Sequence, residues 1–295
     1  MFIHSAALRI RFIVLQLVLL ICLPAWCLAT TITIPSTSSN MPRDQYQIGL
    51  LKLALDKAGF QYTIEHKKHV LSQARITAAL KDSSSGIDIY WMGTSPELED
   101  TLRAVRFPIY QGMLGYRVFI IHKSQQFEFN KVRTLQDLQQ HIGIQGVGWS
   151  DIQILEASGL KQKTSRYNQI LPMVNSGMRP FYFSRGIHEA YGEIEAVKDT
   201  LTDLAVEKNI LLTYPFAMLF FTNKKNEALA SALEKGLHLA HADGSFHAYF
   251  NNDLSNKRAL EKARIHERTW IRIKNPYETP AIKNMNKRYW HQLPR

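Results

Sequence analysis

Residues 87–96 read Ile-Asp-Ile-Tyr-Trp-Met-Gly-Thr-Ser-Pro, and this stretch decides the fold. Ile87 to Met92 form a nearly continuous apolar run, which is typical of a buried strand. The strand is expected to end at Gly93, because Ser95 is a good helix cap and Pro96 suits the first position of a helix. The sequence therefore predicts a buried strand that leads directly into a helix.

Upstream of this strand, two more strands alternate with two helices. Residues 31–34 are short and β-branched, and residues 62–65 form a second extended stretch. Apolar residues recur at helical spacing between residues 48 and 58, and residues 71–80 form another helical segment. This order is typical of an α/β fold with a mainly parallel sheet flanked by helices.

Two extended segments downstream are interpreted as crossings between two lobes. The first is the apolar strand over residues 115–122, and the second covers residues 210–222, broken at Pro215. Strands and helices alternate again between the crossings, and a chain of this length usually divides in two. The expected division is lobe one over residues 30–121 plus 213–295, and lobe two over residues 122–212.

The segment over residues 1–29 has the order of a secretory signal peptide. Arg9 and Arg11 precede an apolar run over residues 12–23, and small residues end the segment at Ala29. The apolar run is shorter than the roughly 18 residues that a membrane anchor needs. We therefore expect export with cleavage after Ala29, rather than an uncleaved anchor.

The chain is basic, with a formal net charge of +11. Cleavage would remove two of the 36 basic residues and none of the 25 acidic ones, which leaves +9. It would also remove both cysteines, Cys22 and Cys27, so no disulfide is expected. The basic residues are spread along the chain and are densest near its C-terminus, which favours a solvated surface over nucleic-acid binding.

Five segments, in this order and spacing, resemble those of the bacterial extracellular solute-binding protein family 3, which has the type 2 periplasmic binding protein fold. The segments are Ile87–Gly93, Val105–Tyr110, Leu114–Ile121, Thr134–Leu138 with Ile142–Gln145, and Asn175–Arg179.

The resemblance implies a two-lobed α/β protein of the periplasm, in which each lobe is a mainly parallel sheet flanked by helices. It implies a monomer that closes over a small-molecule solute and serves an inner-membrane permease or a sensor. Two anchors of the amino-acid-binding members are missing, because Leu98 stands at the position of their arginine and residues 180–183 contain no acid. Arg103 or Arg106 would be the replacement for the arginine, and Glu189 for the acid.

Ligands of open α/β sheets bind at the carboxyl ends of the strands, which predicts where the site lies. Trp91 and Trp149 follow this rule and are typical pocket aromatics, although each can also be a packing residue. Ser150 starts a helix, where backbone N–H groups can receive an anion. The candidate ligand-binding residues are Trp91, Thr94, Ser95, Arg106, Trp149, Ser150, Tyr182, Arg185 and Glu189.

No motif for catalysis or metal binding is found. The chain contains neither a Gly-x-Ser-x-Gly turn nor a Gly-x-x-x-x-Gly-Lys loop. His188 and Glu189 lack the second histidine that a helical zinc site needs. We therefore expect a binding protein with no catalytic residue, metal or cofactor. The alternatives are an enzyme on the same two-lobed scaffold, or a sensory subunit that docks on a membrane signalling protein through the basic C-terminal arm.

Overall fold

The computed structural model describes residues 29–36 and 44–291. The predicted signal peptide, with Cys22 and Cys27, lies outside the described residues except for Ala29. Among the residues that are described, no helix is both long and apolar enough to cross a membrane.

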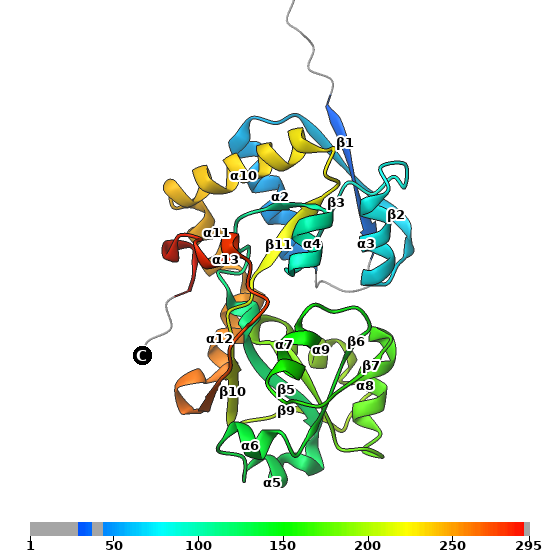
Figure 1. Cartoon of the computed structure of the whole chain (residues 1–295), viewed down its shortest axis with the longest axis vertical. Coiled ribbons are helices and arrows are strands. Elements are labelled where there is room, and N and C mark those ends of the chain that lie inside the picture. The colour runs from blue at the N-terminus through cyan, green and yellow to red at the C-terminus, as the bar shows by residue number, and fades with distance from the viewer. Residues whose placement is uncertain (1–28, 37–43, 292–295) are drawn as a thin grey trace, which may run out of the picture. The chain divides into compact units, whose positions relative to one another are not determined.

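Two small sheets and the helices beside them are built from the first part of the chain and from a later return (Figure 1). One sheet has the order β1-β2 and the other, which we call the small sheet, has the order β3-β11-β4. The elements are β1 (Thr30–Ser36), α2 (Gln45–Ala58), β2 (Tyr62–Val70), α3 (Gln73–Lys81), β3 (Ile89–Gly93), α4 (Pro96–Thr101), β4 (Arg103–Val105), β11 (Met218–Thr222), α10 (Glu227–Ala242) and α11 (Ser245–Asn252).

The large sheet has seven strands in the order β12-β10-β5-β8-β6-β7, with β9 paired to β5. Its elements are β5 (Tyr116–His122), α5 (Gln126–Phe129), α6 (Leu135–Leu138), β6 (Ile142–Gly146), α7 (Asp151–Ala157), β7 (Gln162–Ser165), α8 (Tyr167–Asn175), β8 (Phe181–Gly186), α9 (Ile187–Val197), β9 (Leu204–Val206), β10 (Ile210–Thr213) and β12 (Thr269–Arg272). Helices α8 and α9 pack against this sheet.

Local sequence signals explain where several helices begin and end. Ser95 caps α4 by accepting a hydrogen bond from the Leu98 N–H, and Pro96 occupies the first turn. Thr134 and Asp137 form the capping box of α6. Gly59 ends α2 in the left-handed region, at φ 70°, which glycine adopts without a steric penalty.

The large sheet is mixed and the small sheet is antiparallel, which corrects the prediction of mainly parallel sheets. Strand β11 runs antiparallel to both β3 and β4, and β5 runs antiparallel to β8, β9 and β10. Parallel pairs occur between β6 and β7, β6 and β8, and β10 and β12. The reason is the connection of the chain: β5 carries it into the large sheet, and β10 and β11 bring it back in the opposite direction.

The segment after α11 contacts both groups of elements. Helix α12 (Leu254–Ala263) packs against α9, and β12 joins the large sheet beside β10. The chain then returns past α13 (Pro280–Lys283), where the Thr279 hydroxyl donates to Glu99 at 3.0 Å, and the His291 N–H donates to the Gln111 carbonyl at 2.7 Å. The strand pairs define the sheets but not the limits of two lobes. The division into residues 30–121 plus 213–295 and residues 122–212 therefore stays a prediction.

The apolar core extends between α2 and α10, which pack closely together. Gly236 of α10 makes this approach possible. A Cβ atom at this position would lie 1.7 Å from the Ala54 carbonyl oxygen of α2, so no other residue fits without moving a helix backbone.

We expect Gly236→Ala to lower the free energy of unfolding by about 2 kcal/mol, because overpacking forces the two helices apart. Gly192→Ala is the matched control, since a Cβ there meets no atom within 4 Å. It should raise the free energy of unfolding by roughly 0.5–1 kcal/mol through better helix propensity. Urea denaturation of both variants measures the difference, and equal effects would contradict this account of the packing.

Candidate functional site

A cavity of about 1130 Å³ lies where the small sheet and the large sheet contribute side chains to one space. The small sheet contributes Trp91 and Gly93 from the carboxyl end of β3, and the large sheet contributes Arg185 from the carboxyl end of β8. The Ser150 hydroxyl donates a hydrogen bond of 2.9 Å to the Gly93 carbonyl, which joins the two walls. The cavity therefore lies at strand ends, as the sequence predicts for this class of fold.

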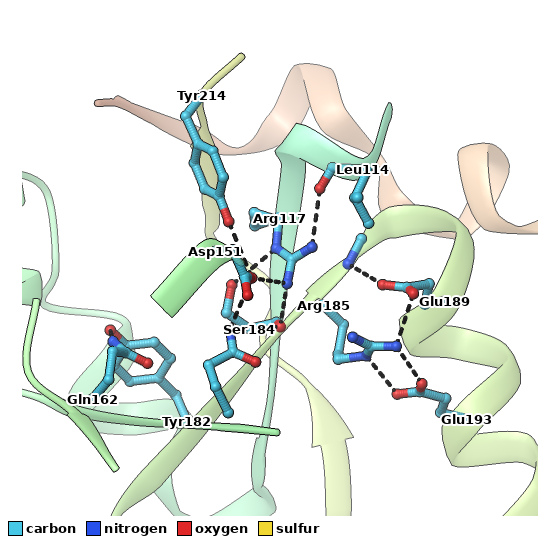
Figure 2. Close-up of polar contacts among 12 residues, drawn as sticks. Leu114, Arg117, Asp151, Gln162, Tyr182, Ser184, Arg185, Glu189, Glu193 and Tyr214 are labelled. Atoms are coloured by element: carbon cyan, nitrogen blue, oxygen red, sulfur yellow. Dashed lines mark hydrogen bonds and ion pairs between the residues drawn. The ribbon is translucent and has the colours of Figure 1, made fainter. Parts of the chain in front are cut away.

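Arg117 and Asp151 form a buried ion pair beside the cavity (Figure 2). Their side chains are 1% and 4% exposed, and Nη2 of Arg117 lies 2.9 Å from Oδ2 of Asp151. The guanidinium also donates to the Leu114 carbonyl at 3.0 Å, and to the Ser184 hydroxyl at 3.2 Å and carbonyl at 2.6 Å. All three nitrogens of the Arg117 guanidinium thus donate hydrogen bonds to groups of the protein.

The carboxylate of Asp151 has further partners. Gln145 Nε2 lies 3.2 Å from its Oδ2, and the Tyr214 hydroxyl donates to the same atom at 3.4 Å. Burial raises the pKa of Asp151, and the nearby Arg117 guanidinium counteracts this rise. Three donors of the protein thus converge on Oδ2, and the pair with Arg117 positions α7 against β5 and β8.

A second buried cluster holds one arginine between two glutamates (Figure 2). Arg185 donates from Nε and Nη2 to Glu193 at 2.9 and 2.6 Å, and its Nη2 lies 2.8 Å from Glu189 Oε1. The guanidinium also lies over the Trp149 ring, 4.7 Å from its centroid. The Tyr167 hydroxyl donates to Glu193 at 2.8 Å.

This cluster carries more negative than positive charge. Burial raises the pKa of Glu189, but nearby positive charge, with Arg185 first and Arg117 in addition, and the Gly186 N–H together outweigh burial and lower that pKa to about 2. Glu189 is therefore ionised at neutral pH and also accepts a hydrogen bond of 2.9 Å from the Gly186 N–H. One guanidinium with two carboxylates leaves a local excess of negative charge.

His188 lies in the cavity wall and stacks on Tyr110, with ring centroids 3.9 Å apart. His188 is 8% exposed, and neither nitrogen of its ring has a hydrogen-bond partner among the described residues. Burial lowers the pKa of His188 to about 4, so the imidazole is neutral at physiological pH. It therefore presents one donor and one acceptor that the protein leaves unused.

The structure brings some of the predicted site residues together. Trp91, Trp149, Ser150, Arg185 and Glu189 all line the cavity. Trp91 also stacks on Tyr90 at 5.2 Å, so it is a packing residue that lines the cavity, and its contact with a ligand stays a prediction.

Four predicted residues do not line the cavity. Thr94 donates its hydroxyl to Glu99 at 2.7 Å, and Ser95 is occupied as the cap of α4. Arg106 is exposed. Tyr182 is fully buried inside the large sheet, where its hydroxyl accepts a hydrogen bond from Gln162 at 3.2 Å.

Arg103 is the other predicted replacement for the arginine that amino-acid-binding members of the family carry, and its side chain also has partners away from the cavity. Arg103 pairs with Glu227 at 2.9 Å and with Glu234 at 3.0 Å, and it does not line the cavity. Leu98, at the position expected for arginine, is buried.

Sequence reasoning missed Arg117, Tyr110 and His188 as site residues. For Arg117 a signal existed, because it is a charged residue inside an otherwise apolar strand, and such a residue needs a buried partner. For His188 and Tyr110 no local signal marks the site, since they meet only through folding.

Among residues 29–36 and 44–291, no group of three or more His, Cys, Asp or Glu side chains is placed to hold a metal ion.

We expect Asp151→Asn to lower the free energy of unfolding by about 3 kcal/mol, because it leaves the buried Arg117 charge without its counter-ion. The exposed pair Lys131–Glu128 supplies the control, and Glu128→Gln should cost less than about 1 kcal/mol. Adding Arg117→Met to Asp151→Asn should recover most of the loss. Urea denaturation tests this, and similar costs for the two single variants would contradict the assignment.

The depressed pKa of His188 predicts a pH dependence of stability. Below pH about 6.5 the unfolded chain protonates this histidine, whereas the folded protein keeps it neutral until the pH nears about 4. The free energy of unfolding should therefore fall as the pH decreases through this window, by up to about 3 kcal/mol from this residue. His188→Phe should lose that part of the pH dependence, while the exposed His266→Phe should keep it. Parallel curves for His188→Phe and the parent protein would count against burial of a neutral imidazole.

No protein-family model matches the chain, and no curated protein matches it. Solved structures do match its fold. An ancestral arginine-binding protein bound to arginine is 16% identical, with a TM-score of 0.56 over 76% of this chain and 98% of that one. A periplasmic binding protein of Salmonella typhimurium with high arginine specificity is 13% identical, with a TM-score of 0.54 over 75% and 97% of the two chains.

A third match is an amino acid ABC transporter substrate-binding protein from Streptococcus pneumoniae, bound to L-arginine. It is 14% identical, with a TM-score of 0.54 over 79% of this chain and 93% of that one. At these identities the likeness is one of fold, and it confirms the predicted fold class. The chain has the α/β fold of the type 2 periplasmic binding proteins.

Proposed function

We propose that this protein binds a small solute in the cavity and closes its two lobes over it, for uptake or for sensing. The observation that carries the proposal is the cavity itself, which takes walls from both the small sheet and the large sheet. Walls that belong to separate sheets can approach or separate by a hinge motion at the crossings, which is how such proteins close around ligands. Trp91, Trp149, Ser150, Arg185 and Glu189 are the proposed contacts.

The similar structures support a binding role without catalysis. Those compared above are described as binding proteins, and one belongs to an amino acid ABC transporter. We therefore propose an inner-membrane permease as the partner of this chain, with a membrane sensor as the second candidate. Residues 1–29 support export, and a monomer in the periplasm is the proposed state.

A thermal-shift screen of the purified protein tests the proposal. A ligand that binds only the folded state raises the melting temperature in a saturable way. Amino acids, peptides, sugars, organic acids and polyamines form the panel. We expect one class to give a shift, and we expect Trp149→Ala to abolish it.

Phe127→Ala is the matched control for an aromatic side chain outside the cavity, since Phe127 is 68% exposed. This variant should keep the ligand-induced shift. Closure is checked by small-angle scattering, where ligand should reduce the radius of gyration. The absence of a shift with every class would refute the binding role.

A further inference from the structure

Five charged side chains of the cavity are engaged by the protein itself: Arg117, Asp151, Arg185, Glu189 and Glu193. Arg258 and Lys262 also line the cavity, at exposed positions. Arg117 donates to Asp151, Ser184 and Leu114, and Arg185 is held between two glutamates. A ligand carboxylate that approached Arg185 would meet the excess negative charge of Glu189 and Glu193 at close range. The part of the cavity around Arg185 is therefore poorly suited to the carboxylate of a free amino acid.

The carboxylates of these two clusters are engaged as well. Glu189 accepts from Arg185 and from the Gly186 N–H, and Glu193 accepts from Arg185 and from Tyr167. Asp151 Oδ2 is shared by three donors. An ammonium group would have to compete with partners that are already in place.

Four buried atoms on residues that line the cavity lack a hydrogen-bond partner among the described residues and belong to neutral groups. Both nitrogens of His188, the Gln47 Oε1 and the Asn256 Nδ2 are buried and have no partner among the described residues. Gln47 is 4% exposed and Asn256 is 2% exposed, and both line the same cavity as His188. A buried polar atom without a partner costs stability, so four such atoms in one cavity point to a ligand that supplies the partners.

A series of ring contacts begins at His188 and runs through residues that line the cavity. His188 stacks on Tyr110, whose ring centroid is 4.5 Å from that of Tyr46, which in turn lies 5.3 Å from that of Tyr249. Gln47 follows Tyr46 in the first turn of α2, and Asn256 lies in the first turn of α12. Phenol and imidazole rings beside amide groups form a surface for a neutral ligand with polar edges.

We propose that the cavity takes an uncharged polar solute, bearing amide or hydroxyl groups, whose donors and acceptors pair with His188, Gln47 and Asn256. This inference rests on the proposed solute-binding function and names its ligand class. It sets this chain apart from its structural neighbours that are described with bound arginine.

Calorimetric titration of the purified protein with matched pairs of probes tests the proposal. Each pair contains a charged compound and an uncharged counterpart: glutamine with Nα-acetylglutamine amide, and glucuronate with glucose. Spermidine represents cations. The uncharged member should bind at least about tenfold more tightly, which corresponds to one buried hydrogen bond or one avoided charge burial. Its affinity should not change between about 0.02 M and about 0.5 M NaCl, because salt screens only charged ligands.

Two variants test the residues. His188→Phe keeps a ring against Tyr110 but removes both nitrogens, and Gln47→Met keeps the length but removes the amide. Each should weaken binding of the uncharged probe about tenfold. His188→Phe should also raise the melting temperature of the unliganded protein, since it removes two unpaired buried atoms. The control His266→Phe, at an exposed position, should change neither quantity.

Tighter binding of glutamine, glucuronate or spermidine than of the uncharged probes would overturn the inference and leave the proposed function standing. So would full affinity for the uncharged probe in both His188→Phe and Gln47→Met. If no compound of any class binds, the proposed function itself fails, and the ligand class falls with it.

Discussion

The ion pair between Arg117 and Asp151 is the interaction on which the site depends. A guanidinium buried to this extent cannot remain without partners, so every group that it contacts is fixed in place. Those groups come from the start of β5, from the first turn of α7 and from β8. Trp149 and Ser150 immediately precede Asp151, and Arg185 immediately follows Ser184. The pair thereby orients two segments of the large-sheet wall of the cavity at once.

Much of the fold follows from local sequence. The apolar run before Gly93, the cap at Ser95 and the capping box at Thr134 all correspond to elements of the structure. The direction of the strands does not follow from local sequence, because β11 pairs with strands that lie far from it in the chain. Hydrophobic periodicity contains no information about which distant segment becomes a neighbour.

The candidate site was predictable where a residue lies in a strand that leads to the cavity or in the first turn of a helix, as for Trp91, Ser150 and Glu189. Tyr182 shows a limit that strand geometry explains. Side chains alternate between the two faces of a strand, so Tyr182 and Arg185 of β8 point to opposite faces. Only Arg185 reaches the cavity, while Tyr182 is buried beside Gln162 in the large sheet. Long-range contacts such as the one between Tyr110 and His188 have no counterpart in local sequence.

The central strand of the small sheet has a consequence for how the chain folds. Strand β11 lies between β3 and β4, but it is synthesised only after all of β5 to β10. Closing such a long loop in an unfolded chain is entropically costly and slow. Pairing of Tyr116 with Thr213 within the large sheet brings the two ends of that loop together. The small sheet is therefore completed most easily on a large sheet that has already formed. Until then the apolar strand β3 lacks the neighbour that it shares with β4, and its free edge is open to association with other chains.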